Sequence, residues 1–279
     1  MKLSPFILRR QAAFTMVEIA ICLAIIGIAL VGIIGILPYG MNTQRDTREE
    51  TLINQDVTML LPAITQGMRG VDDLTNYVYA ITNYWGLYKT NGTLAGTGVN
   101  GYAYNGSVLN ASGPPFYSQV SLWLTNGLNI VGLLSTPEFV ADTVGNPAVP
   151  LIDNADDYQV YSNHIVAYVH ALSGLASEKP PQDNSLLVND AFTYRLLVVN
   201  APVPLDANSY DTPYHQQIWR NQRELRLTFL SPQQPNGTVG NNRLTYRATV
   251  AGVLAPTNAY NNQVLYFYGP QFFNANTNL

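Results

Sequence analysis

The stretch AFTMVEIAICLAIIGIALVGIIGIL, residues 13–37, decides the fold of this chain. From Ile19 to Leu37 it carries no charge, and its only side chain with polar character is the thiol of Cys22. A helix rises about 1.5 Å per residue, so residues 14–37 are long enough to cross a hydrocarbon core of about 30 Å. One carboxylate, Glu18, lies near the start, and a charge at the membrane centre costs about 2.5–3.5 kcal/mol. The stretch therefore predicts a membrane-embedded helix whose acidic residue needs a compensating partner.

The residues around this stretch predict its orientation in the membrane. Residues 1–13 contain three basic residues and no acidic one, whereas residues 45–50 carry both signs of charge. Because positive charge stays on the cytoplasmic side, we expect a cytoplasmic N-terminus and an extracytoplasmic body. A cleaved secretory signal is the alternative, but its apolar core is about 7–15 residues long and a small-residue cleavage site follows that core. Here the apolar run is longer, and the small residues Ala12 and Ala13 precede it.

The order of these signals resembles the class III signal of type IV pilins and type II secretion pseudopilins. A short basic leader and a small residue come first, and a phenylalanine, a glutamate and the apolar run follow. The matching residues are Ala13, Phe14, Thr15, Met16, Val17 and Glu18. The resemblance implies that a membrane-embedded prepilin peptidase cleaves between Ala13 and Phe14 and methylates the new amine of Phe14. The family usually has glycine at the position of Ala13, so we expect cleavage to be slower than in a glycine-containing chain.

Glu18 would be the fifth residue of the cleaved chain, and two roles are open to it. The resemblance implies an assembly role, in which Glu18 pairs with the positive amine of Phe14 on a neighbouring subunit and sets the axial register between helices. A buried carboxylate is tolerated once a cation pairs with it. The alternative is that Glu18 extends to the cytoplasmic headgroups, which its position near the helix start allows.

Composition limits the kind of partner that the chain can bind. Charged residues make up 11% of the 279 residues, and the formal net charge is −4. Removing residues 1–13 takes away three of the 14 basic residues and leaves 11 against 18 acidic ones, a net charge of −7. This balance offers no broad phosphate-binding face, so no nucleic-acid partner is expected. The single cysteine, Cys22, excludes an intramolecular disulfide.

The helix is expected to continue beyond the membrane as a spine that ends near Gly67. Pro38 removes one helical hydrogen bond, which predicts a kink or a locally melted turn. Thr47 with Glu50 predicts a local helix cap after that turn. Further on, apolar residues recur at three- and four-residue steps and mark one face of a helix. They are Ile53, Val57, Leu60, Leu61, Ile64 and Met68.

The remaining sequence predicts two helices, a loop and several strands. Helices are expected at residues 71–85 and 153–176, where apolar residues recur on one side after an acidic start. A long surface loop with room for a hairpin is expected at residues 86–115. Short apolar or alternating runs predict strands, of which the fourth and fifth form a hairpin. These strands are residues 120–124, 128–134, 191–200, 224–231, 243–252 and 264–268.

Helices followed by antiparallel strands predict an α+β architecture. It is pilin-like, with a long N-terminal helical spine packed on an antiparallel β-sheet body. The predicted domains are a cytoplasmic leader at residues 1–13, a spine at residues 14–68 with residues 14–37 in the membrane, and an extracytoplasmic globular body at residues 69–279.

The sequence offers no convincing catalytic site. His164 and His170 are about 200° apart on the helix expected there, so they cannot converge on a metal, and His215 stands apart from both. Nucleophile-elbow, P-loop and dinucleotide-binding patterns do not occur. Cys22 lies in the membrane span, where a cysteine nucleophile is implausible. No catalytic residue, no cofactor and no metal are therefore predicted.

Two clusters have a binding interpretation beside a structural one. Asp153, Asp156 and Asp157 offer oxygen ligands for Ca²⁺, but acids at a helix start also stabilise its N-terminus, and we favour that explanation. A run of rings suggests stacking on DNA or sugars, but only one basic residue is near, so core packing and subunit contacts are the better interpretation. These rings belong to Tyr77, Tyr79, Tyr84, Trp85 and Tyr88.

The resulting hypothesis is a structural subunit that is inserted in the inner membrane and then joins a pilus or pseudopilus. The resemblance implies as partners a prepilin peptidase, other pilin or pseudopilin subunits, an inner-membrane assembly platform and membrane lipid. The large body favours a minor subunit. The alternative function is a membrane-anchored extracytoplasmic binding protein, an adhesin or a DNA- or glycan-binding protein displayed on a filament.

Overall fold

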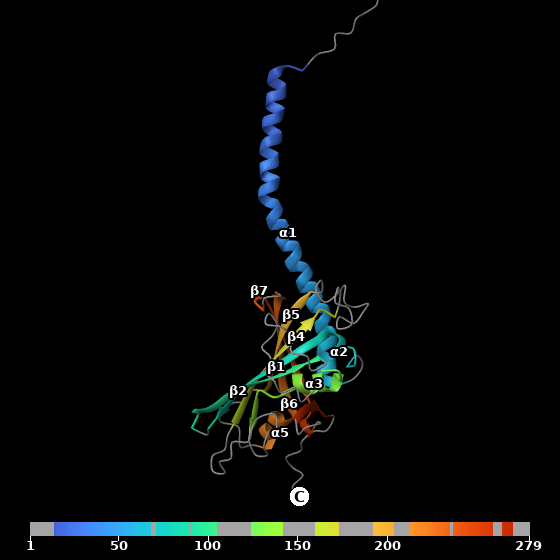
Figure 1. Cartoon of the computed structure of the whole chain (residues 1–279), viewed down its shortest axis with the longest axis vertical. Helices are drawn as coiled ribbons and strands as arrows, with labels where there is room; N and C mark the ends of the chain where they lie inside the picture. The colour runs from blue at the N-terminus through green and yellow to red at the C-terminus, as the bar shows by residue number, and fades with distance from the viewer. Residues whose placement is uncertain are drawn as a thin grey trace, which may run out of the picture. The chain divides into compact units, whose positions relative to one another are not determined.

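The computed structural model describes residues 14–67, 71–89, 91–104, 124–141, 160–172, 192–203, 213–234, 237–258 and 264–269 (Figure 1). The chain forms two compact units, Met1–Arg48 and Glu49–Leu279, which we describe separately. The first unit consists, in its described part, of the start of a long helix. The second unit contains the end of that helix and the sheet, so the chain has the predicted α+β, pilin-like arrangement.

The long helix, α1, runs from Met16 to Gln66 over 51 residues. Gly67 ends it with a φ of 58°, which suits glycine at a helix C-terminus. The spine was therefore predicted correctly. Of the two alternatives predicted at Pro38, the melted turn was wrong, because the helix is unbroken there, and the kink stays a prediction. A proline removes one hydrogen bond, and the turns on either side are enough to keep the backbone helical.

The body is built on a seven-stranded antiparallel sheet with the order β2-β1-β4-β5-β6-β7, and β3 pairs with β4. A separate two-stranded ribbon contains β8 and β9. The strands are β1 (Val78–Tyr88), β2 (Leu94–Ala103), β3 (Phe139–Ala141), β4 (Val160–His170), β5 (Thr193–Pro202), β6 (Gln222–Gln233), β7 (Val239–Ala251), β8 (Leu254–Asn258) and β9 (Val264–Tyr268). Short helices are α2 (Leu74–Tyr77), α3 (Gly127–Leu134) and α5 (Pro213–Asn221).

Three predicted elements of the body were wrong. Residues 71–85 form only the four-residue α2 and then the strand β1. The described part of residues 153–176 contains β4, a strand. Conversely, residues 128–134 belong to the helix α3, whose N-terminus is capped by the side chain of Asn126, which accepts a hydrogen bond from Leu128 N at 2.9 Å.

Other predictions for the body were confirmed. The last four predicted strands correspond to β5, β6, β7 and β9. The strands β6 and β7 form the predicted antiparallel hairpin. The hairpin predicted within residues 86–115 was confirmed only in part, because its second strand, β2, lies in this range but most of its first strand, β1, lies before it. The strand predicted at residues 120–124 lies outside the described residues except for its last residue, Leu124.

The core of the body lies between residues 49–66 of α1 and one face of the sheet, which we call the inner face. Ile53, Leu60 and Ile64 of α1 are almost fully buried in one cluster with Leu196 of β5 and Phe229 of β6. Burial alternates along β5, as expected for a strand with one face on a core. The predicted apolar face of the spine is therefore the face that packs on the sheet, apart from Met68, which lies outside the described residues.

Two carboxylates of α1 are buried in this interface and bind the sheet. Asp56 is 0% exposed, and its Oδ2 accepts hydrogen bonds from Leu172 N at 3.0 Å and from the hydroxyl of Tyr194 at 2.9 Å. Two helical turns earlier, Glu49 Oε2 accepts a hydrogen bond from Asn242 Nδ2 at 3.0 Å. Buried polar groups tolerate only the register that satisfies them, so these contacts fix the position of this part of α1 on the sheet.

Thr47 does not form the predicted cap with Glu50. Its hydroxyl donates instead to the backbone oxygen of Thr43 at 2.8 Å, one turn earlier in the same helix. A threonine caps a helix only where the helix begins, and Thr47 lies in the interior of α1.

His170 gives the body a measurable dependence on pH. It is 6% exposed, its ring lies 4.6 Å from the ring of Tyr79, and burial lowers its pKa to about 4. In the unfolded chain the pKa is about 6.5, so below that pH the unfolded state binds a proton that the folded state does not. We therefore expect His170 to lower the free energy of unfolding as pH falls from about 6.5 to about 4, by up to about 1.4 kcal/mol per pH unit.

This expectation can be checked by urea unfolding of the full-length chain in detergent at about pH 7 and about pH 5. The difference in free energy of unfolding between the two pH values should be smaller in His170→Phe than in the native chain. His164→Phe is the control, since His164 is an exposed histidine of the same strand. An unchanged difference in His170→Phe would show that His170 is not the group that titrates.

Candidate assembly site at the start of the helix

The predicted cleavage and assembly residues lie at the N-terminal end of α1. Phe14 and Thr15 directly precede the helix, and Glu18 lies in its first turn. Phe14 is 81% exposed, and every side chain of residues 14–48 is exposed. Ala13, on the other side of the predicted cleavage site, lies outside the described residues. Within the described residues, no part of the chain therefore covers Phe14, the predicted N-terminus after cleavage.

Thr15 and Glu18 form a capping box. The backbone N and the hydroxyl of Thr15 each donate to Glu18 Oε2 at 3.0 Å. In return, the backbone N of Glu18 donates to the Thr15 hydroxyl oxygen at 3.3 Å. Such reciprocal bonds satisfy two of the N–H groups that a helix leaves open at its start. Glu18 therefore has a structural role within its own chain before any partner binds.

Sequence reasoning missed this capping box, although the signal was present. Thr15 and Glu18 have the Thr-x-x-Glu spacing, the same as Thr47 and Glu50. Only the first pair stands at a helix start, where open N–H groups exist to be satisfied. The position of the helix start, rather than the spacing, decides which pair forms the cap.

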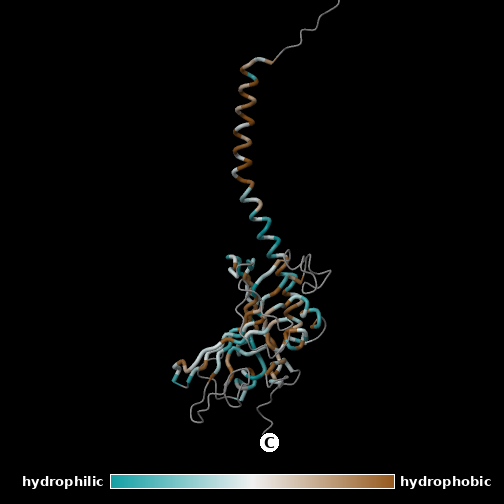
Figure 2. The backbone as a smooth tube through the Cα atoms, in the orientation of Figure 1, coloured by the Kyte–Doolittle hydropathy of each residue, from teal (hydrophilic) through white to brown (hydrophobic). Residues whose placement is uncertain are grey.

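The first half of α1 has the length and composition of a membrane-spanning helix. Among the described helices, α1 alone is long and apolar enough to cross a membrane, and none of its most apolar 18-residue window is buried in the chain. Figure 2 shows this part of α1 as hydrophobic and the following turns as hydrophilic. This pattern fits membrane anchoring near the N-terminus. Cys22 is exposed in the same segment.

The remaining predicted clusters do not form a second site. His164 and His170 lie on β4 rather than on a helix, and six residues of strand separate them by about 20 Å. Asp153, Asp156 and Asp157 lie outside the described residues. Among the residues that are described, no group of three or more potential metal ligands occurs.

In the aromatic run at residues 77–88, some rings pack within the body and others are exposed. Tyr79 packs against His170 and Tyr168, and Trp85 packs edge-on against Tyr161 at 6.2 Å. Tyr88 is 38% exposed at the end of β1. Since β1 is a strand, its successive side chains point to opposite faces, so the cluster does not form one continuous stacking surface.

Comparison with known families identifies a motif at this end of the chain. The prokaryotic N-terminal methylation motif matches residues 8–34. Together with the long apolar helix, this motif is consistent with the type IV pilin and pseudopilin family. It implies processing by a prepilin peptidase and assembly with other pilin subunits, and it is a motif of structural subunits rather than enzymes. No curated protein and no solved structure matches the chain.

Proposed function

We propose that this chain is a prepilin-like structural subunit of a type II secretion pseudopilus or a type IV pilus. A prepilin peptidase cleaves it between Ala13 and Phe14 and methylates the amine of Phe14. The observation that carries the proposal is the methylation motif at residues 8–34, which coincides with the start of an apolar helix. Every side chain in residues 14–48 is exposed, and a subunit needs such a surface for lipid first and for neighbouring helices later.

The geometry of Glu18 supports an assembly role. Thr15 occupies Oε2, whereas Oε1 makes no hydrogen bond within the described residues. Because Thr15 holds Oε2, the carboxylate group is fixed and Oε1 points in a defined direction. We propose that Oε1 accepts the Phe14 amine of a neighbouring subunit, where the opposite charge offsets the cost of burial in the membrane. Extension of Glu18 to the headgroups remains the competing role.

The proposed location follows from the same features. The leader carries the positive charge, so the N-terminus is cytoplasmic, residues 14–37 span the inner membrane and the body is extracytoplasmic before assembly. The proposed partners are the peptidase, other pilin or pseudopilin subunits, an inner-membrane assembly platform and lipid. A body of this size favours a minor subunit.

N-terminal processing is the direct test. When the chain is produced with a prepilin peptidase, the mature protein is expected to begin at Phe14 and to carry the mass of one additional methyl group. Peptide mass spectrometry of the N-terminus measures both features. In a time course, Ala13→Gly is expected to be cleaved faster than the native chain, because glycine is the smaller residue.

The control is the same chain produced without the peptidase, which should keep residues 1–13. A mature protein that starts after Leu37 would instead identify a secretory signal. An intact leader in the presence of the peptidase would contradict the proposal as a whole.

A further inference from the structure

The sheet has a second face, which points away from α1 and which we call the outer face. On β7, Tyr246 donates its hydroxyl proton to Asn54 of α1, and Asn242 donates to Glu49 of α1. The even-numbered residues of β7 therefore face the helix. Because side chains alternate along a strand, its odd-numbered residues face outward, and those from 241 to 251 are exposed.

The pairing register gathers four arginines on this outer face. Arg226 of β6 lies directly opposite Arg247 of β7. Leu230 of β6 lies opposite Arg243 on one side and opposite Arg195 of β5 on the other. We call the four residues Arg195, Arg226, Arg243 and Arg247 the basic face. Arg243 and Arg247 are exposed.

The basic face is positive in a chain that is negative overall. Among the outward residues of β5, β6 and β7, only Glu224 carries a negative charge, which leaves three net positive charges. The whole chain has a net charge of −4. A local charge of the opposite sign to the whole molecule indicates a surface for an anionic partner.

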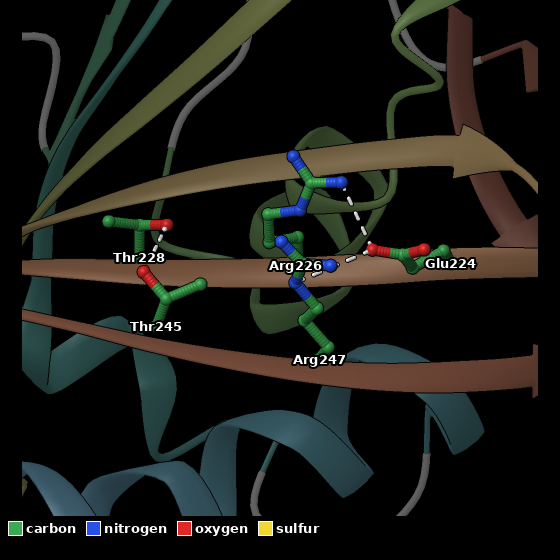
Figure 3. A network of polar contacts seen from close by, with 5 residues as sticks. All are labelled: Glu224, Arg226, Thr228, Thr245 and Arg247. Atoms are coloured by element: carbon green, nitrogen blue, oxygen red, sulfur yellow. Dashed lines mark hydrogen bonds and ion pairs between the residues drawn. The ribbon is translucent and has the colours of Figure 1, made fainter.

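Contacts within the basic face leave its guanidinium groups only partly neutralised. Figure 3 shows Glu224 Oε1 next to two guanidinium groups, 3.0 Å from Arg226 and 3.8 Å from Arg247. Like charges directly opposite on a sheet destabilise it, and one carboxylate cannot offset both. Arg226 Nε is buried and makes no hydrogen bond. Arg243 forms no ion pair within the described part of the chain.

Hydroxyl groups lie between the arginines. Thr228 and Thr245 are cross-strand partners whose hydroxyl oxygens are 3.2 Å apart (Figure 3). Only one of the two hydroxyl protons can lie in this hydrogen bond, so the other hydroxyl keeps a proton to donate. Planar guanidinium groups next to hydroxyl donors are well suited to bind carboxylates.

We propose that the basic face docks an acidic segment of a second copy of this chain, residues 142–159. This inference rests on the proposed function and applies where two copies of this chain are neighbours in the filament. The segment contains four aspartates and no basic residue, so its charge complements the basic face. The four are Asp142, Asp153, Asp156 and Asp157. A contact between two different parts of identical chains is heterologous, and such contacts build an open helical filament when the rotation between copies does not close a ring.

A polypeptide is favoured over a nucleic acid as the partner. Single-stranded nucleic acid needs exposed rings for stacking as well as positive charge. On the basic face, the ring of Tyr168 lies 5.3 Å from the guanidinium carbon of Arg195, but Tyr168 is only 1% exposed. Tyr246 points to α1 on the inner face. The described part of the basic face therefore offers charge without a stacking platform.

The first test is a charge exchange in the full-length chain during filament assembly. Arg243→Glu with Arg247→Glu reverses the basic face, and Asp153→Lys with Asp156→Lys reverses the acidic segment. We expect either reversal to lower the amount of processed chain in filaments by about tenfold, and their combination in one chain to restore it to within about threefold. Arg220→Glu, at an exposed arginine on α5, is the control for reversal of one positive charge outside the basic face and should have little effect.

A second test does not require filaments. Arg247→Cys and Asp156→Cys are made separately in a Cys22→Ser background, and the two full-length proteins are mixed in detergent under oxidising conditions. A disulfide-linked dimer that contains one copy of each variant is expected. Arg220→Cys mixed with Asp156→Cys is the control and should cross-link at least about tenfold less.

The outcomes separate this inference from the proposed function. Correct processing and assembly without any effect of the charge reversals, or without the mixed dimer, would overturn only the docking inference. An unprocessed chain would overturn the proposed function, while the mixed dimer would still report on the contact. Binding of a short single-stranded oligonucleotide that is lost in Arg243→Glu with Arg247→Glu would assign the basic face to nucleic acid and overturn the inference.

Discussion

Replacing Glu18 by glutamine is expected to leave insertion and cleavage intact and to lower incorporation into filaments by about tenfold or more. A capping box accepts glutamine as well as glutamate at its N3 position. The cap with Thr15 is therefore kept while the charge is lost. The variant therefore separates the two roles of this side chain. If the charge pairs with a neighbouring Phe14 amine, its removal leaves that cation without a partner in the membrane, which costs several kcal/mol.

The measurement compares the amount of processed chain in purified filaments with the amount of processed chain that stays in the membrane. Asp46→Asn is the matched control, since it removes one exposed acid from the same helix outside the apolar run. Normal incorporation of Glu18→Gln would contradict the assembly role and leave extension to the headgroups as the function of the charge. Loss of cleavage in this variant would instead place Glu18 in recognition by the peptidase.

Replacing Asp56 by alanine is expected to lower the free energy of unfolding of the body by about 3 kcal/mol. The substitution leaves two buried donors without an acceptor, Leu172 N and the hydroxyl of Tyr194, at about 1–3 kcal/mol each. Burial and the charge of Asp56 raise the pKa of Tyr194 well above its usual value, so its hydroxyl stays protonated and remains a donor. Chemical unfolding of the full-length chain in detergent, followed by tryptophan fluorescence, measures the change.

Two variants test whether the loss comes from these hydrogen bonds. Tyr194→Phe removes one donor and is expected to cost about 1–2 kcal/mol, and the double variant should cost less than the sum of both. Glu50→Ala is the matched control, because it removes an exposed acid from the same helix and should change stability by less than about 0.5 kcal/mol. An unchanged unfolding midpoint in Asp56→Ala would show that the carboxylate does not stabilise the body.

Local sequence signals were sufficient to predict the spine and the C-terminal strands. The apolar run predicts the first half of α1, the three- and four-residue spacing predicts the second half, and Gly67 marks its end. The hairpin of β6 and β7 was predictable because its strands alternate and turn residues separate them. These features depend on neighbours in sequence, so a single chain is enough to reveal them.

The spacing of apolar residues did not predict the correct element where a helix or strand is buried on more than one side. Every residue of the strand β4 except the exposed His164 is buried or half-buried, so its apolar residues lack a clean alternation. The strand is rich in β-branched and aromatic residues, which was the better signal. The helix α3 is buried over most of its surface and reads as a plain apolar run. Its capping residue, Asn126, was the clue to a helix.

The residues proposed to act in assembly and those that hold the body together divide in the same way. Phe14 and Glu18 were predicted because they belong to a contiguous motif, and their roles stay predictions. The buried roles of Glu49 and Asp56 were missed, because their partners are distant in sequence and no local pattern points to them. The basic face was missed for a similar reason, since Arg226 and Arg247 become neighbours only through strand register.

The buried carboxylates of α1 also constrain the order in which the body forms. Asp56 binds partners 116 and 138 residues later in the chain, and Glu49 binds Asn242, 193 residues later. During synthesis, this half of the helix emerges long before the strands that satisfy it. Contacts between such distant residues form slowly, and the intermediate exposes its apolar face meanwhile. The nascent chain therefore carries an unprotected amphipathic helix until β6 and β7 have been made, and it needs shelter from aggregation during that interval.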